Sequence, residues 1–256
     1  MLNVVYSSHK RRNPNDLMSF ILDTFHHELN ESKNNYYQPK IPNEYDRNDV
    51  VKCGIYNFLQ FNSSIISNNF NWFRIEQTKC PNCLSLIYNF DTYNTFELDI
   101  LGAYKNKSFN SIKLIECTKY TNSNAKIKNK FCQKCGDNTQ MSSNSGIFSL
   151  SNMIIFSLSR GDLEDNLMNI PFTLQDKIDL TSLVEKGPMN YELTGVVSIT
   201  KENNNFIFVS FCKSPIDGQW YLYKDSQVQQ TDLSCVISLN NNKNYTPCIL
   251  GYKVKI

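Results

Sequence analysis

Cys80-Pro81-Asn82-Cys83 and Cys132-Gln133-Lys134-Cys135 are two Cys-x-x-Cys pairs in one chain. Two such pairs can supply the four thiolates of a tetrahedral zinc site, and the two-residue spacing lets each pair form a turn whose amides donate to the sulfurs. A shell of four sulfurs leaves no position for water, so this zinc is expected to be structural rather than catalytic. We therefore predict a structural zinc bound by Cys80, Cys83, Cys132 and Cys135, the alternative being four free thiols.

The composition around these pairs argues against two classes of partner. The chain has 256 residues and a formal net charge of +2, and its basic residues gather only in Lys10-Arg11-Arg12 and in the spaced set Lys126, Lys128 and Lys130. We interpret both as solvated surface, because a nucleic-acid reader needs a basic face with interleaved aromatic residues. No apolar run approaches the roughly 20 residues that cross a bilayer. We expect no nucleic-acid partner and no membrane partner.

Cysteine usage indicates a reducing compartment. Nine cysteines are an odd number, and a disulfide framework is typical of short secreted chains rather than of a chain of this size. We expect the protein to be intracellular, either cytoplasmic or nuclear. The remaining five cysteines are interpreted as packed thiols without a chemical role: Cys53, Cys117, Cys212, Cys235 and Cys248.

The hydrophobic pattern predicts one helix followed by many strands, which is an α+β arrangement. Asn13-Pro14 is a good helix start, and Leu17, Ile21, Phe25 and Leu29 then repeat every four residues beside Met18 and Leu22. Residues 31–49 read as a loop, 53–61 as an apolar segment of uncertain type, and 111–120 as a short helix before a polar loop that ends near residue 130. Strands are expected at 72–78, 96–100, 147–158, 191–200, 206–212, 220–223 and 248–256.

A long insertion separates the two cysteine pairs, and the segments that flank it resemble a known family in their order along the chain. Residues 13–23 look like the Gln-Gln-Asp box and helix of the ubiquitin-specific proteases, which are papain-like deubiquitinases with finger, palm and thumb regions. Five other stretches are similar to the entry into the fingers and to palm strands of that family: 64–83, 150–160, 172–180, 191–197 and 220–228, with 248–253 as the terminal strand.

This resemblance implies a fold and a division of the chain. We expect a single domain over residues 1–256, with antiparallel β fingers and palm, a zinc-ribbon finger tip and a partial helical thumb. Residues 1–61 are predicted to be the thumb remnant, 62–146 mostly zinc-binding fingers and 147–256 mostly palm.

The same resemblance indicates that the catalytic triad is lost. The family's Gly-Asn-Thr-Cys box lies before the Gln-Gln-Asp helix, and we expect this chain to begin too late to contain it. Cys53-Gly54 resembles that box only superficially, so Cys53 is interpreted as a structural cysteine. The family's catalytic histidine corresponds to Ile207 and its orienting acid to Lys224, although Asp225 matches an acidic neighbour. Losing one member of such a triad already removes most of its catalysis.

Binding of the ubiquitin tail is expected to be weakened. In family members the Gln-Gln-Asp box touches the Arg-rich tail of ubiquitin, and Asp16 matches its carboxylate. Ser19 replaces the glutamate that the family has three residues later. One charge-assisted contact is therefore expected where the family makes two.

Three functions follow from these observations. The leading hypothesis is a catalytically inactive domain that binds ubiquitin, a ubiquitin-like protein or other proteins. On this hypothesis the chain is not expected to act as an enzyme. The second is a fragment of a cysteine-type deubiquitinase whose nucleophile lies outside this chain. The third is an assembly scaffold that does not bind ubiquitin.

Overall fold

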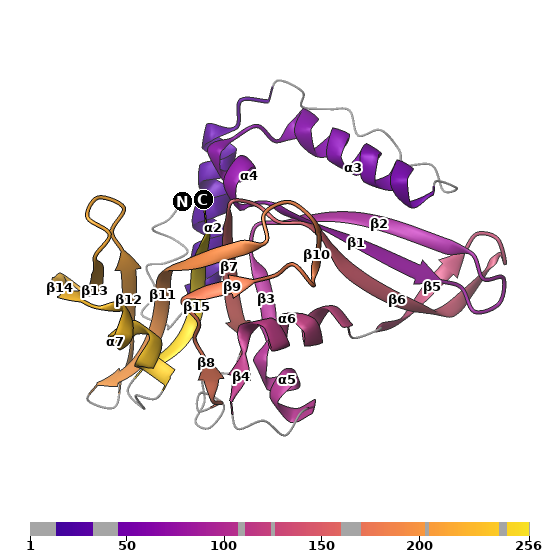
Figure 1. Cartoon of the computed structure of the whole chain (residues 1–256). Coiled ribbons are helices and arrows are strands. Elements are labelled where there is room, and N and C mark those ends of the chain that lie inside the picture. Colours follow the sequence, from indigo (N-terminus) through magenta and orange to yellow (C-terminus); the bar gives the residue numbers. More distant parts are fainter. Residues whose placement is uncertain are drawn as a thin grey trace.

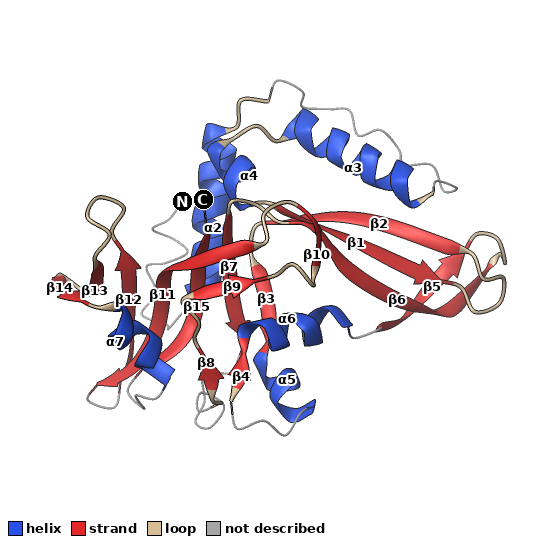
Figure 2. Ribbon diagram, in the orientation of Figure 1, coloured by secondary structure: helices blue, strands red, loops and turns tan. Residues whose placement is uncertain are grey.

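A computed structural model describes residues 14–32, 46–106, 111–123, 126–159, 170–202, 205–240 and 245–255. Two β-sheets form most of this structure, one at the left and one extending to the right in Figures 1 and 2. The predicted N-cap Asn13, the basic run at residues 10–12 and Arg160 lie outside the described residues.

The larger sheet, which we call the palm sheet, has eight strands in the order β14-β13-β12-β11-β15-β7-β3, with β9 paired to β11. All its neighbouring strands are antiparallel except β3 and β7. Its strands are β3 (Phe96–Asp99), β7 (Met153–Ser159), β9 (Lys177–Asp179), β11 (Asn190–Glu202), β12 (Asn205–Lys213), β13 (Trp220–Lys224), β14 (Gln227–Thr231) and β15 (Tyr245–Val254).

The smaller sheet, which we call the finger sheet, has five strands and projects away from the palm (Figure 1). β1 pairs with β2 and β6, while β5 and β10 pair with β6. Its strands are β1 (Trp72–Lys79), β2 (Leu86–Tyr93), β5 (Lys126–Cys132), β6 (Asp137–Ser149) and β10 (Val184–Lys186). β3 from the predicted finger region lies in the palm sheet and β10 from the predicted palm region lies in the finger sheet, so the region boundaries stay a prediction.

Helices and one small ladder complete the described structure. β4 (Ile112–Lys113) and β8 (Phe172–Thr173) form a two-stranded parallel pair. The helices are α2 (Pro14–Leu29), α3 (Arg47–Phe61), α4 (Ile65–Phe70), α5 (Ile100–Asn106), α6 (Leu114–Ser123) and α7 (Leu233–Ile237) with a 3-10 turn at Ser238–Asn240. No helix in the described ranges is long and apolar enough to cross a membrane.

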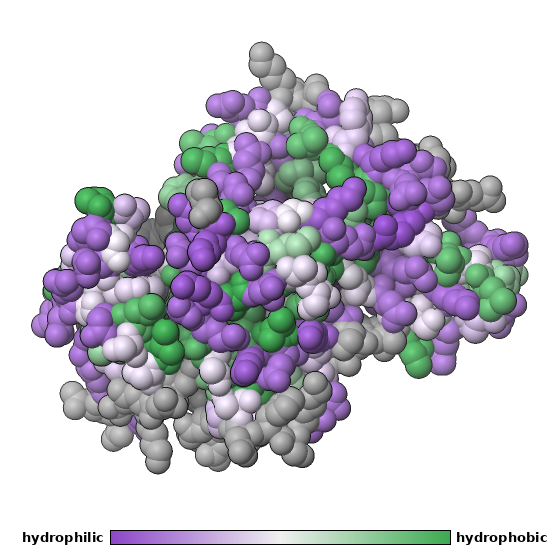
Figure 3. Space-filling model, in the orientation of Figure 1, coloured by the Kyte–Doolittle hydropathy of each residue, from purple (hydrophilic) through white to green (hydrophobic). Residues whose placement is uncertain are grey.

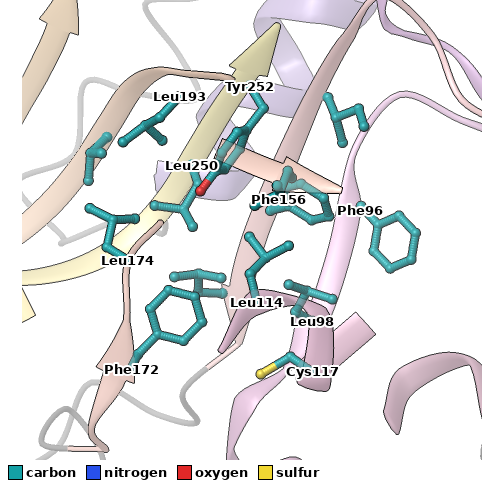
Figure 4. Close-up of a cluster of buried hydrophobic side chains, with 14 of the residues drawn as sticks. Phe96, Leu98, Leu114, Cys117, Phe156, Phe172, Leu174, Leu193, Leu250 and Tyr252 are labelled. Carbon is teal, nitrogen blue, oxygen red and sulfur yellow. The ribbon is translucent and has the colours of Figure 1, made fainter. Parts of the chain in front are cut away.

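The main core fills one face of the palm sheet (Figure 4). Phe156, Leu250 and Tyr252 are fully buried there, beneath the α5 and α6 region. Trp72 joins the finger strand β1 to this core, since its ring stacks on Phe96 at 4.5 Å between centroids. Smaller clusters lie on the other face of the palm, under α2, and beneath α3 on the finger sheet.

The predicted N-terminal helix is present as α2, described from Pro14 to Leu29, but its buried side was not predicted correctly. Leu22 is 4% exposed and packs with Met18 against the palm sheet, whereas Leu17, Phe25 and Leu29 are 38%, 49% and 50% exposed. The four-residue repeat therefore marks an exposed apolar stripe on α2, which lies beside the stripe of Met18 and Leu22 that packs against the palm sheet. α2 carries more apolar surface than the described structure covers.

Three other sequence expectations need correction. The segment of uncertain type belongs to α3, whose N-terminus at Arg47 shortens the predicted loop; residues 33–45 of that loop are outside the described ranges. The polar run before the second cysteine pair is strand β5, because its side chains alternate between solvent and the carboxylate of Glu76. The apolar run at 147–158 is two strands in different sheets, β6 and β7. Strand β2 was not predicted at all.

Candidate functional site

The four paired cysteines meet at the far end of the finger sheet. Their Sγ atoms all lie within 4.8 Å of one another, with Cys80 to Cys135 at 3.8 Å and Cys83 to Cys132 at 3.6 Å. Sulfurs at 2.3 Å from a tetrahedral zinc are about 3.8 Å apart. The spacing and the soft donor set therefore fit a zinc ion, and the four cysteines that the sequence singled out are brought together as predicted.

Local backbone geometry explains this convergence. Each pair closes a tight turn, because the Leu84 amide donates to the Cys80 carbonyl at 3.1 Å and the Gly136 amide donates to the Cys132 carbonyl at 2.8 Å. Both turns end in the left-handed region, with φ of 60° at Leu84 and 73° at Gly136. Glycine adopts this conformation without strain and leucine does not. Strands β1 and β5 then carry the two turns to the same end of the sheet.

Hydrogen bonds divide the thiols into those that accept and one that donates. The Ser85 hydroxyl lies 3.0 Å from Cys83 Sγ, and donation from that hydroxyl and from the Ser85 amide lowers the pKa of the Cys83 thiol to about 6. Hydrogen bonds to neighbouring sulfurs raise the pKa of Cys135 to about 12. Backbone donation from Cys83 is the main cause that lowers the pKa of Cys80. The hydrogen bonds to Cys80 and Cys83 thus lower the pKa of both thiols, and the thiolate is the form that binds metal.

A charged cluster stabilises the strands behind the cysteines. Glu76 on β1 is 8% exposed and pairs with Lys128, and Lys130 Nζ lies 3.5 Å from its carboxylate. Burial alone would raise the pKa of Glu76, but hydrogen bonds from Lys128, Ser143 and Asn89 outweigh it and lower the pKa to about 2. This carboxylate therefore stays ionised and ties β5 to β1 across β6.

The two positions that the sequence resemblance assigns to a catalytic histidine and acid lie on one face of the palm sheet. Ile207 on β12 pairs in register with Thr200 and packs against the main core. Lys224 at the end of β13 pairs with Glu202 of the neighbouring hairpin, and this hydrogen bond raises the pKa of its ammonium. Asp225 follows in the turn with φ of 49°. Ile207 carries no ionisable group, and the ammonium of Lys224 is held by Glu202.

Cys53 and Asp16 lie apart from these positions. Cys53 is half-buried on α3, over the finger sheet, whereas Ile207 and Lys224 belong to the palm sheet. Asp16 lies in the first turn of α2, which packs on the palm face that carries Phe206 and Phe208, opposite the face where Ile207 packs. The structure therefore does not bring either residue together with Ile207 and Lys224.

Asp16 borders a small cavity between α2 and the palm edge. The cavity has a volume of about 180 Å³, and Ser19, Ile155 and Glu97 also line it. In the sequence, Glu97 is only one position of the strand expected at 96–100. The structure places Glu97, on β3, in the lining of the same cavity as Ser19 and Asp16. Only the packing of β3 beside α2, which sequence spacing does not reveal, identifies this residue.

A palm sheet joined to a finger sheet, with four cysteines at the finger tip, is the hand-like architecture expected for a ubiquitin-processing protease. The sequence model described as ubiquitin carboxyl-terminal hydrolase matches residues 1–252, and the chain belongs to that family. The α+β finger-and-palm prediction is thereby confirmed. No curated protein matches the chain in sequence.

Solved structures agree with this family. The chain aligns with the SAGA DUB module Ubp8/Sgf11/Sus1/Sgf73 bound to monoubiquitin at a TM-score of 0.67 and 19% identity, over 100% of this chain and 51% of the other. The same module bound to ubiquitin aldehyde aligns at a TM-score of 0.66 and 19% identity, over 100% of this chain and 52% of the other. A yeast SAGA DUB module with a variant Sgf73 aligns at a TM-score of 0.65 and 20% identity, over 95% of this chain and 51% of the other. The chain thus spans about half the length of the structures it matches.

Proposed function

We propose that this chain is a catalytically inactive ubiquitin-specific-protease-like domain that binds ubiquitin or another protein. The observation that carries the proposal is the pair Ile207 and Lys224, which the sequence resemblance assigns to the positions of the proton-accepting histidine and its orienting acid. Cysteine-protease chemistry needs an imidazole to take the thiol proton and return it to the leaving group. An isoleucine packed against the core cannot do this, and Lys224 is engaged by Glu202.

Hydrolysis and covalent capture test this proposal. The purified chain is expected to leave a fluorogenic C-terminal ubiquitin amide intact and to remain unlabelled by a ubiquitin probe that carries a cysteine-reactive group. A double variant, Ile207→His with Lys224→Asp, is expected to stay inactive, since it restores two positions without a nucleophile. Turnover by the unmodified chain at a rate proportional to its concentration would refute the proposal.

Zinc is proposed as the structural cofactor of the finger tip. The sulfur separations and the low pKa of Cys83 support this, because four soft donors at these distances suit a closed tetrahedral site. Elemental analysis of protein purified without added metal is expected to give one zinc per chain. Cys132→Ser is expected to lower this ratio, whereas Cys235→Ser, at an exposed cysteine on α7, leaves it unchanged. Equal zinc in both variants would contradict the assignment.

Ubiquitin is the proposed partner, and its basic tail is the proposed contact at Asp16 and Glu97. Two of the matched Ubp8 complexes contain ubiquitin, and two acidic residues that line one cavity suit guanidinium groups. A titration of ¹⁵N-labelled ubiquitin is expected to shift its C-terminal amides. Asp16→Asn and Glu97→Gln are each expected to weaken binding by about tenfold, since a charged hydrogen bond contributes about 1.5–3 kcal/mol. Glu28→Gln, exposed at the far end of α2, is the matched control. A flat titration would favour the scaffold function instead.

A second candidate function is a fragment that works with another polypeptide segment. The exposed stripe of Leu17, Phe25 and Leu29 on α2 favours it, because apolar helix faces are usually covered in the assembled protein. A longer transcript that encodes a Gly-Asn-Thr-Cys box would support this function. Activity would still require a histidine at position 207 and an acid at position 224.

An intracellular location, cytoplasmic or nuclear, is also part of the proposal. All nine cysteines lie in the described ranges and none forms a disulfide. Free thiols persist in reducing compartments. Immunofluorescence of the tagged full chain, compared with a secreted marker, tests this expectation.

A further inference from the structure

Strand β5 forms an uncovered edge of the finger sheet. It pairs with β6, and no other strand of the described residues pairs with its outer side. An edge of this kind presents unpaired amide and carbonyl groups to any extended chain. Within the described ranges, α3 packs chiefly against β2 at the opposite edge, so it leaves β5 open.

The two faces of β5 differ in chemistry. Ile127 and Phe131 point to one face and are 73% and 55% exposed, while Lys128 and Lys130 point to the other face and reach Glu76. The first face continues across the sheet, because the register aligns Ile127 with Ser142, Lys79 and Leu86. Leu86 is 43% exposed, and Figure 3 shows hydrophobic side chains at this outer end of the fingers.

Charge identifies what kind of strand fits this edge. Glu76 is one carboxylate between two ammonium groups, and no second carboxylate pairs with Lys128 or Lys130 within the described residues. The Lys face therefore keeps an excess of positive charge. A second copy of the chain fits poorly, since antiparallel pairing of β5 with itself about Asn129 places Lys128 opposite Lys130 of the second copy, and like charges across a ladder are destabilising.

We propose that the β5 edge binds an extended segment of another protein in which acidic residues alternate with apolar ones. The segment adds a sixth strand to the finger sheet, with its acidic side chains over Lys128 and Lys130 and its apolar side chains beside Ile127 and Phe131. Residues of one face recur every 6–7 Å along both strands, so the alternation matches over the length of β5. Backbone pairing supplies the contact and the alternation supplies specificity. This inference is independent of ubiquitin binding, which the proposed function places on other residues.

Peptide binding to the zinc-loaded full chain tests the proposal. Three fluorescein-labelled peptides are used: four Glu-Val repeats, a block of four Glu before four Val, and four Lys-Val repeats. Fluorescence anisotropy is expected to show binding of the Glu-Val repeats at least tenfold tighter than the block peptide, and none for the Lys-Val repeats. Amide shifts in the NMR spectrum are expected to be largest within residues 126–132.

Variants separate strand addition from general charge attraction. Lys130→Glu is expected to weaken binding of the Glu-Val repeats by about tenfold, and Ile127→Thr by several-fold without changing charge or strand propensity. Lys134→Glu is the matched control, since it reverses an equally charged side chain in the turn beyond β5. Equal binding of the alternating and block peptides, equal loss in Lys130→Glu and Lys134→Glu, or no binding at all would overturn the proposal. Concentration-dependent dimers that Ile127→Thr abolishes would assign the edge to a second copy and also overturn it.

Discussion

Replacing Glu76 with glutamine removes the carboxylate that joins β1 to Lys128 and Lys130 while keeping its shape. The fall in its pKa from 4.5 to about 2 corresponds to about 3.4 kcal/mol of stabilisation at neutral pH. The two lysine side chains are 37% and 29% exposed, so solvent screening reduces this figure. We expect Glu76→Gln to lower the free energy of unfolding by about 2 kcal/mol at pH 7.

The pH dependence provides a sharper test. Because the folded-state pKa is depressed, the stabilisation is complete above the unfolded-state value near 4.5 and is lost as the pH falls towards 2. Urea unfolding of the wild type and variant, both stripped of metal so that zinc release does not differ between the two conditions, should show their difference at pH 7 shrinking by about 1 kcal/mol at pH 3.5. Glu97→Gln, at an exposed carboxylate on β3, is the control and should change stability by less than about 0.5 kcal/mol. A variant as stable as the wild type at pH 7, or a difference unchanged by acid, refutes the reasoning.

Three other substitutions test the packing described above. In Gly136→Ala the added Cβ meets no atom within 4 Å, so the substitution should cost only backbone strain, about 1 kcal/mol. This cost should appear as weaker zinc retention against a competing chelator, and unchanged retention would show that the turn relaxes. Gly54→Ala places a Cβ 2.3 Å from Phe90 Cδ1 and should destabilise the contact of α3 with β2 by about 1–3 kcal/mol, seen as faster hydrogen exchange in α3 but not in β11. Tyr191→Phe removes a buried hydroxyl that donates to the Ser151 and Pro188 carbonyls at 2.7 and 3.1 Å, and should cost about 1–3 kcal/mol in urea unfolding; a neutral effect would mean that these carbonyls find other partners.

The cluster of four cysteines was the most predictable part of the chain, for a physical reason. Metal ligation demands particular residue types at a particular spacing, so the sequence alone was enough to predict the cluster of Cys80, Cys83, Cys132 and Cys135. Strands with one solvent face, such as β3, were predictable because burial imposes an alternation of period two.

Features that depend on packing between distant segments were not predictable. The stripe of Leu17, Phe25 and Leu29 has helical period, but period alone does not say which of two neighbouring apolar stripes is packed. β5 reads as polar because its lysines face a carboxylate from β1, which lies far away in sequence. Glu97 became a candidate for binding only when β3 was found beside α2.

Strand β6 gives the fingers a mechanical property. Its thirteen residues, Asp137–Ser149, extend from the cysteine tip to the palm, a span of about 41 Å. The register of β1 against β6 shifts between Phe73 and Arg74, at the palm end of that span. A rotation of the strand by 5° about its palm end would displace the end that carries the cysteines by about 4 Å. A small change in packing at the palm end would therefore move the tip without altering any residue there.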